Sequence, residues 1–208
     1  MLTFDVAAQF VIVAVVLSLV PGPDNLFVLM QSAISGVRSG LAVTLGLCTG
    51  LIVHTTAVAF GVAAVFAASA VAFTALKVIG AAYLLYLAWN AFRTSGARDR
   101  QASAVSGSFG ALYLRGVVMN ITNPKVAIFF LAFLPQFVHP STGPVVPQIF
   151  QLGALFIVAT WMVFSAVALL AGRLSGWLRR SERAIPVMNK LAGVVFVGLA
   201  AKLMTAQR

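Results

Sequence analysis

The sequence predicts an all-α polytopic membrane protein, and both its composition and its pattern of apolar stretches favour this class. Of the 208 residues, 61% are hydrophobic and only 9% are charged, and the mean hydropathy is +1.03. Soluble domains carry about a quarter charged residues. Apolar stretches near or above the ~20 residues that cross a bilayer recur along the chain. We therefore expect a single domain, 1–208, with six transmembrane helices at 4–31, 41–66, 70–92, 111–134, 148–172 and 187–205.

The connections between these stretches differ in charge, and this difference predicts the topology. The second and fourth connections carry neither Lys nor Arg, whereas the first, third and fifth are basic. Because cytoplasmic connections are enriched in Lys and Arg, both termini should be periplasmic. Lys202 and Arg208 count against this topology, and a chain of five spans would place the N-terminus inside. The basic residues of the odd connections are Arg38, then Arg93, Arg98 and Arg100, then Arg173, Arg179, Arg180 and Arg183.

The first apolar stretch contains the motif Pro21-Gly22-Pro23-Asp24-Asn25. Prolines and glycine interrupt a helix, and broken membrane helices are tolerated where the backbone lines a cavity. Pro23 suits the first turn of a new helix, and Gly22 suits the cap before it. A carboxylate at membrane depth is costly, so we expect Asp24 to bind a substrate ammonium or a coupling proton. The alternative is that Asp24 only complements the helix dipole.

The fourth stretch contains a second interruption, Asn120-Ile121-Thr122-Asn123-Pro124-Lys125. Asn123 is expected as the N-cap and Pro124 as the first helical residue. Lys125 is then a cation at the positive end of a helix, which is unfavourable without a nearby anion. We expect it to pair with Asp24, because no other acid lies well inside a predicted span; the alternative is that Lys125 snorkels to the membrane surface. The predicted substrate site comprises Pro21, Gly22, Pro23, Asp24, Asn25, Asn120, Asn123, Pro124 and Lys125.

The two halves of the chain show an internal repeat. Residues 77–83 (KVIGAAY) align with residues 190–196 (KLAGVVF), so that Lys, Gly and an aromatic residue keep the same offsets. Two halves of three spans each must have opposite orientations, and inverted repeats with corresponding helix breaks mark the central site of a transporter. Pro23-Asp24 in the first stretch corresponds roughly to Pro124-Lys125 in the fourth. We expect repeat 1 at 1–100, a cytoplasmic linker at 93–110 and repeat 2 at 111–208.

Small residues stand out in the second, third and sixth spans, and one histidine stands out in the second. Gly46 and Gly50 form a G-x-x-x-G, which permits close helix approach, and we expect Gly80 and Gly193 to serve packing as well. His54 follows one turn after Gly50. An intramembrane histidine titrates near neutral pH and could pass protons, or it could be a hydrogen-bonded packing residue. Asp24 and His54 are therefore both candidates for proton coupling.

Several chemistries lack the residues that they need. No G-x-x-x-x-G-K-[ST] motif is present, so ATP does not power this chain directly. One Cys, two separated His and four scattered acids cannot build an all-protein metal site, and we expect neither metal nor cofactor. No Ser/His/Asp arrangement with supporting spacing appears, so an enzyme is not expected. The net charge of +10 does not indicate nucleic acid, because the basic residues lie between apolar spans.

The motifs that carry a family resemblance are Pro21-Gly22-Pro23-Asp24, the span with Gly46, Gly50 and His54, Lys77-x-x-Gly80-x-x-Tyr83-Leu84, and Asn123-Pro124-Lys125 followed by Phe129-Phe130. They resemble the LysE/RhtB family of bacterial amino-acid exporters, and most closely its homoserine/threonine/leucine branch. The resemblance covers essentially the whole chain. It implies export of amino acids or close derivatives across the bacterial inner membrane, driven by the proton gradient.

Residues and resemblance agree on a secondary exporter of neutral amino acids. Two half-helix N-termini with Lys125 could hold a substrate carboxylate, and Asp24 with exposed carbonyls could hold the ammonium. The alternatives are an exporter of another small solute or cation, a membrane-embedded enzyme, or a non-transport membrane subunit. A cation path would need several oxygen or sulfur ligands. The expected partners are the amino acid, protons and the lipid bilayer; the sequence is also compatible with a homo-oligomer.

Overall fold

The computed structural model describes residues 2–20, 22–68, 70–93, 107–171, 173 and 184–205, and every regular element in them is a helix. The predicted site residue Pro21 and the arginines at 98, 100, 179, 180 and 183 lie outside these residues. In chain order the elements are α1 (Phe4–Leu19), α2 (Pro23–Ser35), α3 (Val37–Ala68), α4 (Ala70–Arg93), α5 (Phe109–Ile121), α6 (Pro124–Ile128), the π-helix η2 (Phe129–Phe133), the 3₁₀-helices η3 (Leu134–Phe137) and η4 (Pro140–Thr142), α7 (Val145–Leu169) and α9 (Ala184–Thr205).

The described helices confirm a polytopic membrane protein. Three helices are long and apolar enough to cross a bilayer without a break, over Val37–Gly61, Val145–Leu169 and Pro186–Thr205. Two bent pairs, α1 with α2 and α5 with α6 to η3, raise the number of candidate spans to five. Helix α4 has 24 residues and lies where the third span was expected, but it is not among these candidates. The count of six spans therefore stays a prediction.

The first predicted connection is wrong in extent. Residues 32–40 were expected to link two spans, but α2 continues to Ser35 and α3 begins at Val37. The link is Gly36 alone, whose φ of 87° lies in the left-handed region that favours glycine. The small polar side chains of this segment suggested a loop, but Ser32 lies in α2 and bonds to the carbonyl of Val28 one turn earlier. Ser39 lies in α3 and bonds to the carbonyl of Ser35 at the end of α2.

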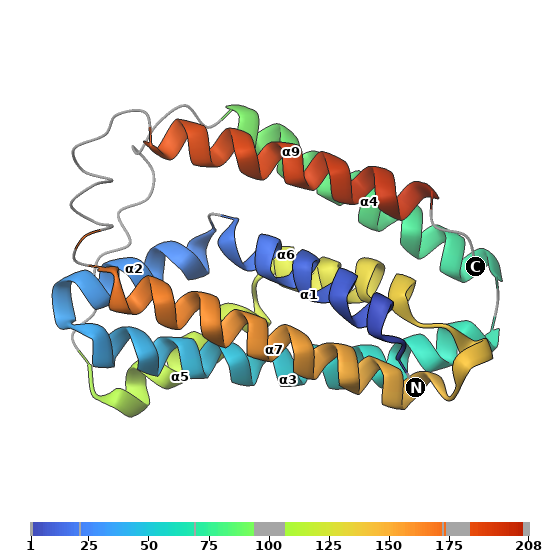
Figure 1. The fold of residues 1–208 in the computed structure, drawn as a ribbon, viewed down its shortest axis with the longest axis horizontal. Coiled ribbons are helices and arrows are strands. Elements are labelled where there is room, and N and C mark those ends of the chain that lie inside the picture. Colours follow the sequence, from blue (N-terminus) through green and yellow to red (C-terminus); the bar gives the residue numbers. More distant parts are fainter. Residues whose placement is uncertain are drawn as a thin grey trace.

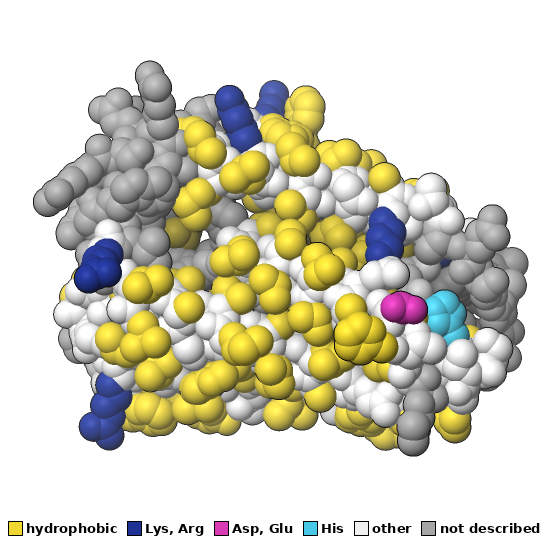
Figure 2. All heavy atoms as spheres, in the orientation of Figure 1, with side chains coloured by type: hydrophobic (Ala, Val, Ile, Leu, Met, Phe, Trp, Pro, Cys, Tyr) yellow, Lys and Arg dark blue, Asp and Glu magenta, His cyan; other side chains and the backbone are white. Residues whose placement is uncertain are grey.

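The helices form an elongated bundle in which α1, α2 and α6 lie in the middle (Figure 1). Helices α3, α5 and α7 pack along one side, and α4 pairs with α9 on the other. The chain runs in opposite directions in α3 and α7, and in α4 and α9, and both termini lie at the same end (Figure 1). Hydrophobic side chains cover most of the described part of the face seen in Figure 2, as expected for a surface in contact with lipid.

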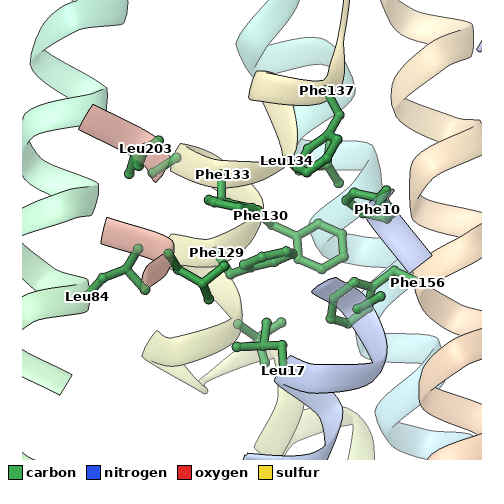
Figure 3. Packing of buried hydrophobic residues seen from close by; sticks show 14 of the residues in the cluster. Phe10, Leu17, Leu84, Phe129, Phe130, Phe133, Leu134, Phe137, Phe156 and Leu203 are labelled. Atoms are coloured by element: carbon green, nitrogen blue, oxygen red, sulfur yellow. The ribbon is translucent and has the colours of Figure 1, made fainter. Parts of the chain in front are cut away.

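Phenylalanines from α1, η2, η3 and α7 fill the core between the breaks and the end that holds the termini (Figure 3). Phe10 packs edge-on against Phe137 at a ring-centroid distance of 5.1 Å, and Phe130 meets Phe156 in the same way. Phe129 stacks on Phe133, also at 5.1 Å. All six side chains are buried. This aromatic cluster fills the space between α1, α7 and the second half of the other broken helix, η2 and η3.

Glycines set the closest helix contacts. A Cβ at Gly46 of α3 would meet the carbonyl oxygen of Tyr113 on α5, and a Cβ at Gly116 would meet the carbonyl oxygen of Val43. Gly50, one turn further along α3, faces the side chain of Asn120. In the α4–α9 pair, Gly80 lies against Ala132 and Leu203, and Gly193 lies against Phe92. Each of these two helices thus places a glycine against a large side chain near the C-terminal end of the other.

The Gly46 contact predicts a large effect of a single methyl group. Gly46→Ala should lower the free energy of unfolding by roughly 1–3 kcal/mol, because its Cβ meets backbone that cannot move aside. Gly61→Ala, in the same helix, is the matched control, since its Cβ would meet no atom within 4 Å. It should be neutral or stabilising by up to about 1 kcal/mol through helix propensity. Thermal unfolding in detergent compares them, and equal midpoints would refute the tight α3–α5 contact.

Candidate functional site

The first break separates α1 from α2 with a bend of 61°. Helix α2 begins at Pro23 with Gly22 as its N-cap, as the sequence predicted. Gly22 has an extended backbone (φ −157°), so its conformation does not require glycine. Its missing side chain matters for space instead: a Cβ there would lie 3.1 Å from Nζ of Lys125. The break therefore makes room for a cation from the other half of the chain.

The second break separates α5 from α6 with a bend of 50°. Asn123 is the N-cap, and its Oδ1 accepts a hydrogen bond of 3.0 Å from the backbone N–H of Lys125. Pro124 is the first helical residue, where its missing N–H costs nothing. The predicted cap and helix start are both confirmed.

The structure brings the two breaks together through Asp24 and Asn123. Nδ2 of Asn123 donates a hydrogen bond of 2.8 Å to Oδ2 of Asp24, across 99 residues of sequence. Both side chains are only 4% exposed. A buried carboxylate is costly unless hydrogen bonds and opposite charges compensate it, so this contact anchors Asp24 at the point where the half-helices meet.

Lys125 lies in the same place, against the end of α1. Its Nζ donates a hydrogen bond of 3.4 Å to the carbonyl oxygen of Val20, the C-cap of α1. The C-terminal end of a helix carries partial negative charge and unpaired carbonyls, which favour a cation. Lys125 is also the opposite charge with the largest electrostatic interaction with Asp24. The pairing of Lys125 with Asp24 that the sequence suggested stays a prediction. The sequence analysis missed the carbonyl of Val20, because the local pattern does not show which helix end faces Lys125.

His54 and Asn120 lie beside this pair. Nε2 of His54 is 3.1 Å from the carbonyl oxygen of Asn120, in the last turn of α5, and its ring packs on Phe130 at a centroid distance of 5.7 Å. These contacts suit both a packing histidine and a proton carrier.

Three buried side-chain oxygens near the breaks have no hydrogen-bond partner among the described residues. They are Oδ1 of Asp24, Oδ1 of Asn25 and Oδ1 of Asn120. The other end of Asn25 is fixed, because its Nδ2 donates to the carbonyl oxygen of Ser18 at 2.7 Å. Buried polar atoms are nearly always paired in native proteins, so unpaired acceptors favour a ligand that donates hydrogen bonds. An ammonium group, with three N–H donors, has this character.

Two further polar residues near the first break were missed by the sequence analysis. The hydroxyl groups of Ser18 on α1 and Thr160 on α7 lie 3.2 Å apart, and both residues are buried. Single hydroxyl residues in apolar helices carry little signal, which explains the omission. Within the described residues, no group of three or more His, Cys, Asp or Glu side chains could hold a metal ion.

Comparison with known proteins identifies the family. Residues 15–207 match the sequence profile of the LysE type translocators. The chain belongs to the LysE family. A homoserine/homoserine lactone efflux protein of Salmonella typhi is 34% identical over 206 residues, which cover 99% of each chain. An uncharacterized membrane protein of Vibrio cholerae is 35% identical over 198 residues, or 95% of this LysE-family chain and 96% of its own.

A leucine efflux protein of Salmonella choleraesuis is 30% identical to this LysE-family chain over 199 residues, 95% of this chain and 94% of its own. No solved structure matches the chain. LysE-family proteins are translocators, so this multi-pass protein is a membrane transporter and not an enzyme.

Proposed function

We propose that this LysE-family protein is a secondary active exporter of neutral amino acids or close derivatives across the bacterial inner membrane, coupled to protons. The observation that carries the proposal is the buried carboxylate of Asp24 at the start of α2, hydrogen-bonded to the cap of α6. Acids at membrane depth mark substrate and ion pathways, and broken helices mark the central sites of transporters.

A zwitterion fits the charges around the two breaks. The unpaired oxygens of Asp24, Asn25 and Asn120 suit a substrate ammonium. The N-terminus of α2 and the Lys125 ammonium suit a substrate carboxylate. The relatives are named for efflux of homoserine, homoserine lactone and leucine, which supports a small neutral amino acid. Apolar walls separate substrates that differ by one methylene by only about 1–3 kcal/mol, so we expect a broad range.

An architecture of six spans in two inverted repeats accounts for the arrangement of the helices. In this assignment α3 corresponds to α7, and α4 to α9, and both pairs run antiparallel (Figure 1). Helix α3 packs on α5 of the other half, and α7 packs on α1, as inverted repeats would require. The helix ends that carry Arg38 and Arg93 lie opposite the termini, which supports cytoplasmic odd-numbered connections and periplasmic termini.

The aromatic cluster supports a site that is closed toward the termini. Its six phenylalanines lie between the breaks and the end that holds both termini, and all are buried. With periplasmic termini, the structure corresponds to a state closed to the periplasm. Export then requires the cluster to open, so that the site is exposed alternately on the two sides of the membrane.

Proton coupling makes a direct prediction about energetics. Cells that express the protein and are loaded with a panel of labelled amino acids should lower their internal concentration below the external one. An uncoupler should abolish this uphill efflux while leaving downhill exchange, because the gradient and not the binding site is lost. Uphill efflux that persists at zero proton gradient would contradict proton coupling. Efflux of none of the amino acids, with the protein present in the membrane, would contradict the substrate class.

A further inference from the structure

Asn123 uses both ends of its amide group, and each end serves a different break. Its Oδ1 accepts from the N–H of Lys125 and so caps α6, and its Nδ2 donates to Oδ2 of Asp24 at the start of α2. The side chain is 4% exposed, so water offers little competition for either contact. A planar amide has one acceptor end and one donor end, so a single orientation of the group satisfies both partners.

We propose that Asn123 is a positioning residue for Asp24, an inference that rests on the proposed export function. A carboxylate group turns easily about its last torsion, since that torsion has only broad, two-fold minima. The Asn123 bond fixes it through Oδ2 and leaves Oδ1, which is buried without a partner among the described residues, to accept the substrate ammonium or the proton. The cap of α6 thereby sets the orientation of the acid on α2.

Capping alone does not account for asparagine at this position. An N-cap needs only a side-chain acceptor, and Ser, Thr and Asp cap about as well as Asn. The donor Nδ2 adds nothing to the cap, and its recorded partner is the carboxylate of Asp24. Asn123→Ser therefore keeps the acceptor of the cap and removes the donor to Asp24, whereas Asn123→Asp keeps the cap and places an anion against Asp24.

The test compares export by wild type, Asn123→Ser, Asn123→Asp, Asp24→Asn and the exchange variant D24N/N123D. Asn123→Ser should raise the half-saturating concentration of the exported amino acid about tenfold, the size of one hydrogen bond to a charged group, with a smaller change in maximal rate. Asn189→Ser is the matched control, because Asn189 is also buried but lies on α9. It should leave the half-saturating concentration unchanged.

The exchange variant tests whether Asn123 orients the Asp24 carboxylate for export or only holds α2 and α6 together. With Asn at 24 and Asp at 123, the donor and acceptor trade places and α6 keeps its cap. We expect an unfolding midpoint above that of Asn123→Asp, but no recovery of export, because α2 has lost its acid. Wild-type half-saturation in Asn123→Ser, or wild-type export by the exchange variant, would overturn the proposal.

The unfolding midpoints also separate this inference from the proposed function. If the wild type exports no amino acid of the panel, the proposed function fails. The unfolding midpoints of Asn123→Asp, Asp24→Asn and the exchange variant still report on the Asn123–Asp24 bond. Recovery of the midpoint in the exchange variant supports the bond. Strictly additive losses would show that the two side chains do not act together and would overturn the positioning role.

Discussion

Asp24→Asn is expected to reduce export by roughly 10- to 100-fold, the range for one hydrogen bond to a charged group. The amide keeps the size and the buried position of the carboxylate, but it removes the charge that faces Lys125 and the acceptor that we assign to the ammonium or proton. It also places an Nδ2 donor or a weaker oxygen acceptor opposite Nδ2 of Asn123. Initial rates of labelled efflux, normalised to the amount of protein in the membrane, measure the change.

Asp5→Asn is the matched control for this prediction. Asp5 lies exposed in the first turn of α1, so the same substitution removes the same charge far from the breaks. Export by this variant should stay within about twofold of wild type, since surface charges contribute little. Equal loss in both variants would mean that net charge or insertion, and not the site, accounts for the effect.

Lys125→Met is expected to have the second-largest effect, on both stability and export. Methionine preserves the length of the side chain but leaves the buried Asp24 without its strongest opposite charge. Lys125 is only partly buried, so we expect the loss of unfolding free energy to lie at or below the about 3–5 kcal/mol that breaking a fully buried charge pair costs. The substrate carboxylate would lose its cation as well, so we expect export to fall by at least about tenfold.

Lys190→Met provides the comparison, because Lys190 is exposed on α9 and the change in charge is the same. It should affect neither the unfolding midpoint nor the export rate by a measurable amount. Exchanging the charges, Asp24→Lys with Lys125→Asp, should export better than either single variant. An exchange that is no better than the single variants would remove the support for an Asp24–Lys125 pair.

Local features of this fold could be predicted from the sequence because they depend on local chemistry. Proline without an N–H, preceded by a residue that can cap a helix, marks the start of α2 at Pro23 and of α6 at Pro124. Long apolar runs mark α3, α7 and α9 as spans. The family motifs pointed to LysE, and the match over residues 15–207 confirms this.

Contacts between distant segments could not be predicted in the same way. Nothing in the local pattern shows that Asn123 donates to Asp24, or that the carbonyl of Val20 receives Lys125, because both depend on how the half-helices are placed in space. The π-helix at η2 was also unforeseen, since its five residues continue an apolar run that reads as ordinary α-helix. Gly116 was missed as the partner of Gly46, because that contact depends on how α3 and α5 are placed against each other.

Transport by the purified protein in liposomes tests the central claim most directly. Wild type and Asp24→Asn would be reconstituted with labelled leucine and homoserine on one side and an imposed proton gradient. We predict gradient-driven accumulation by wild type, its collapse with an uncoupler, and a rate for Asp24→Asn at least about tenfold lower at equal protein content. Equal accumulation by both proteins, or accumulation that ignores the proton gradient, would contradict a proton-coupled export site built around Asp24.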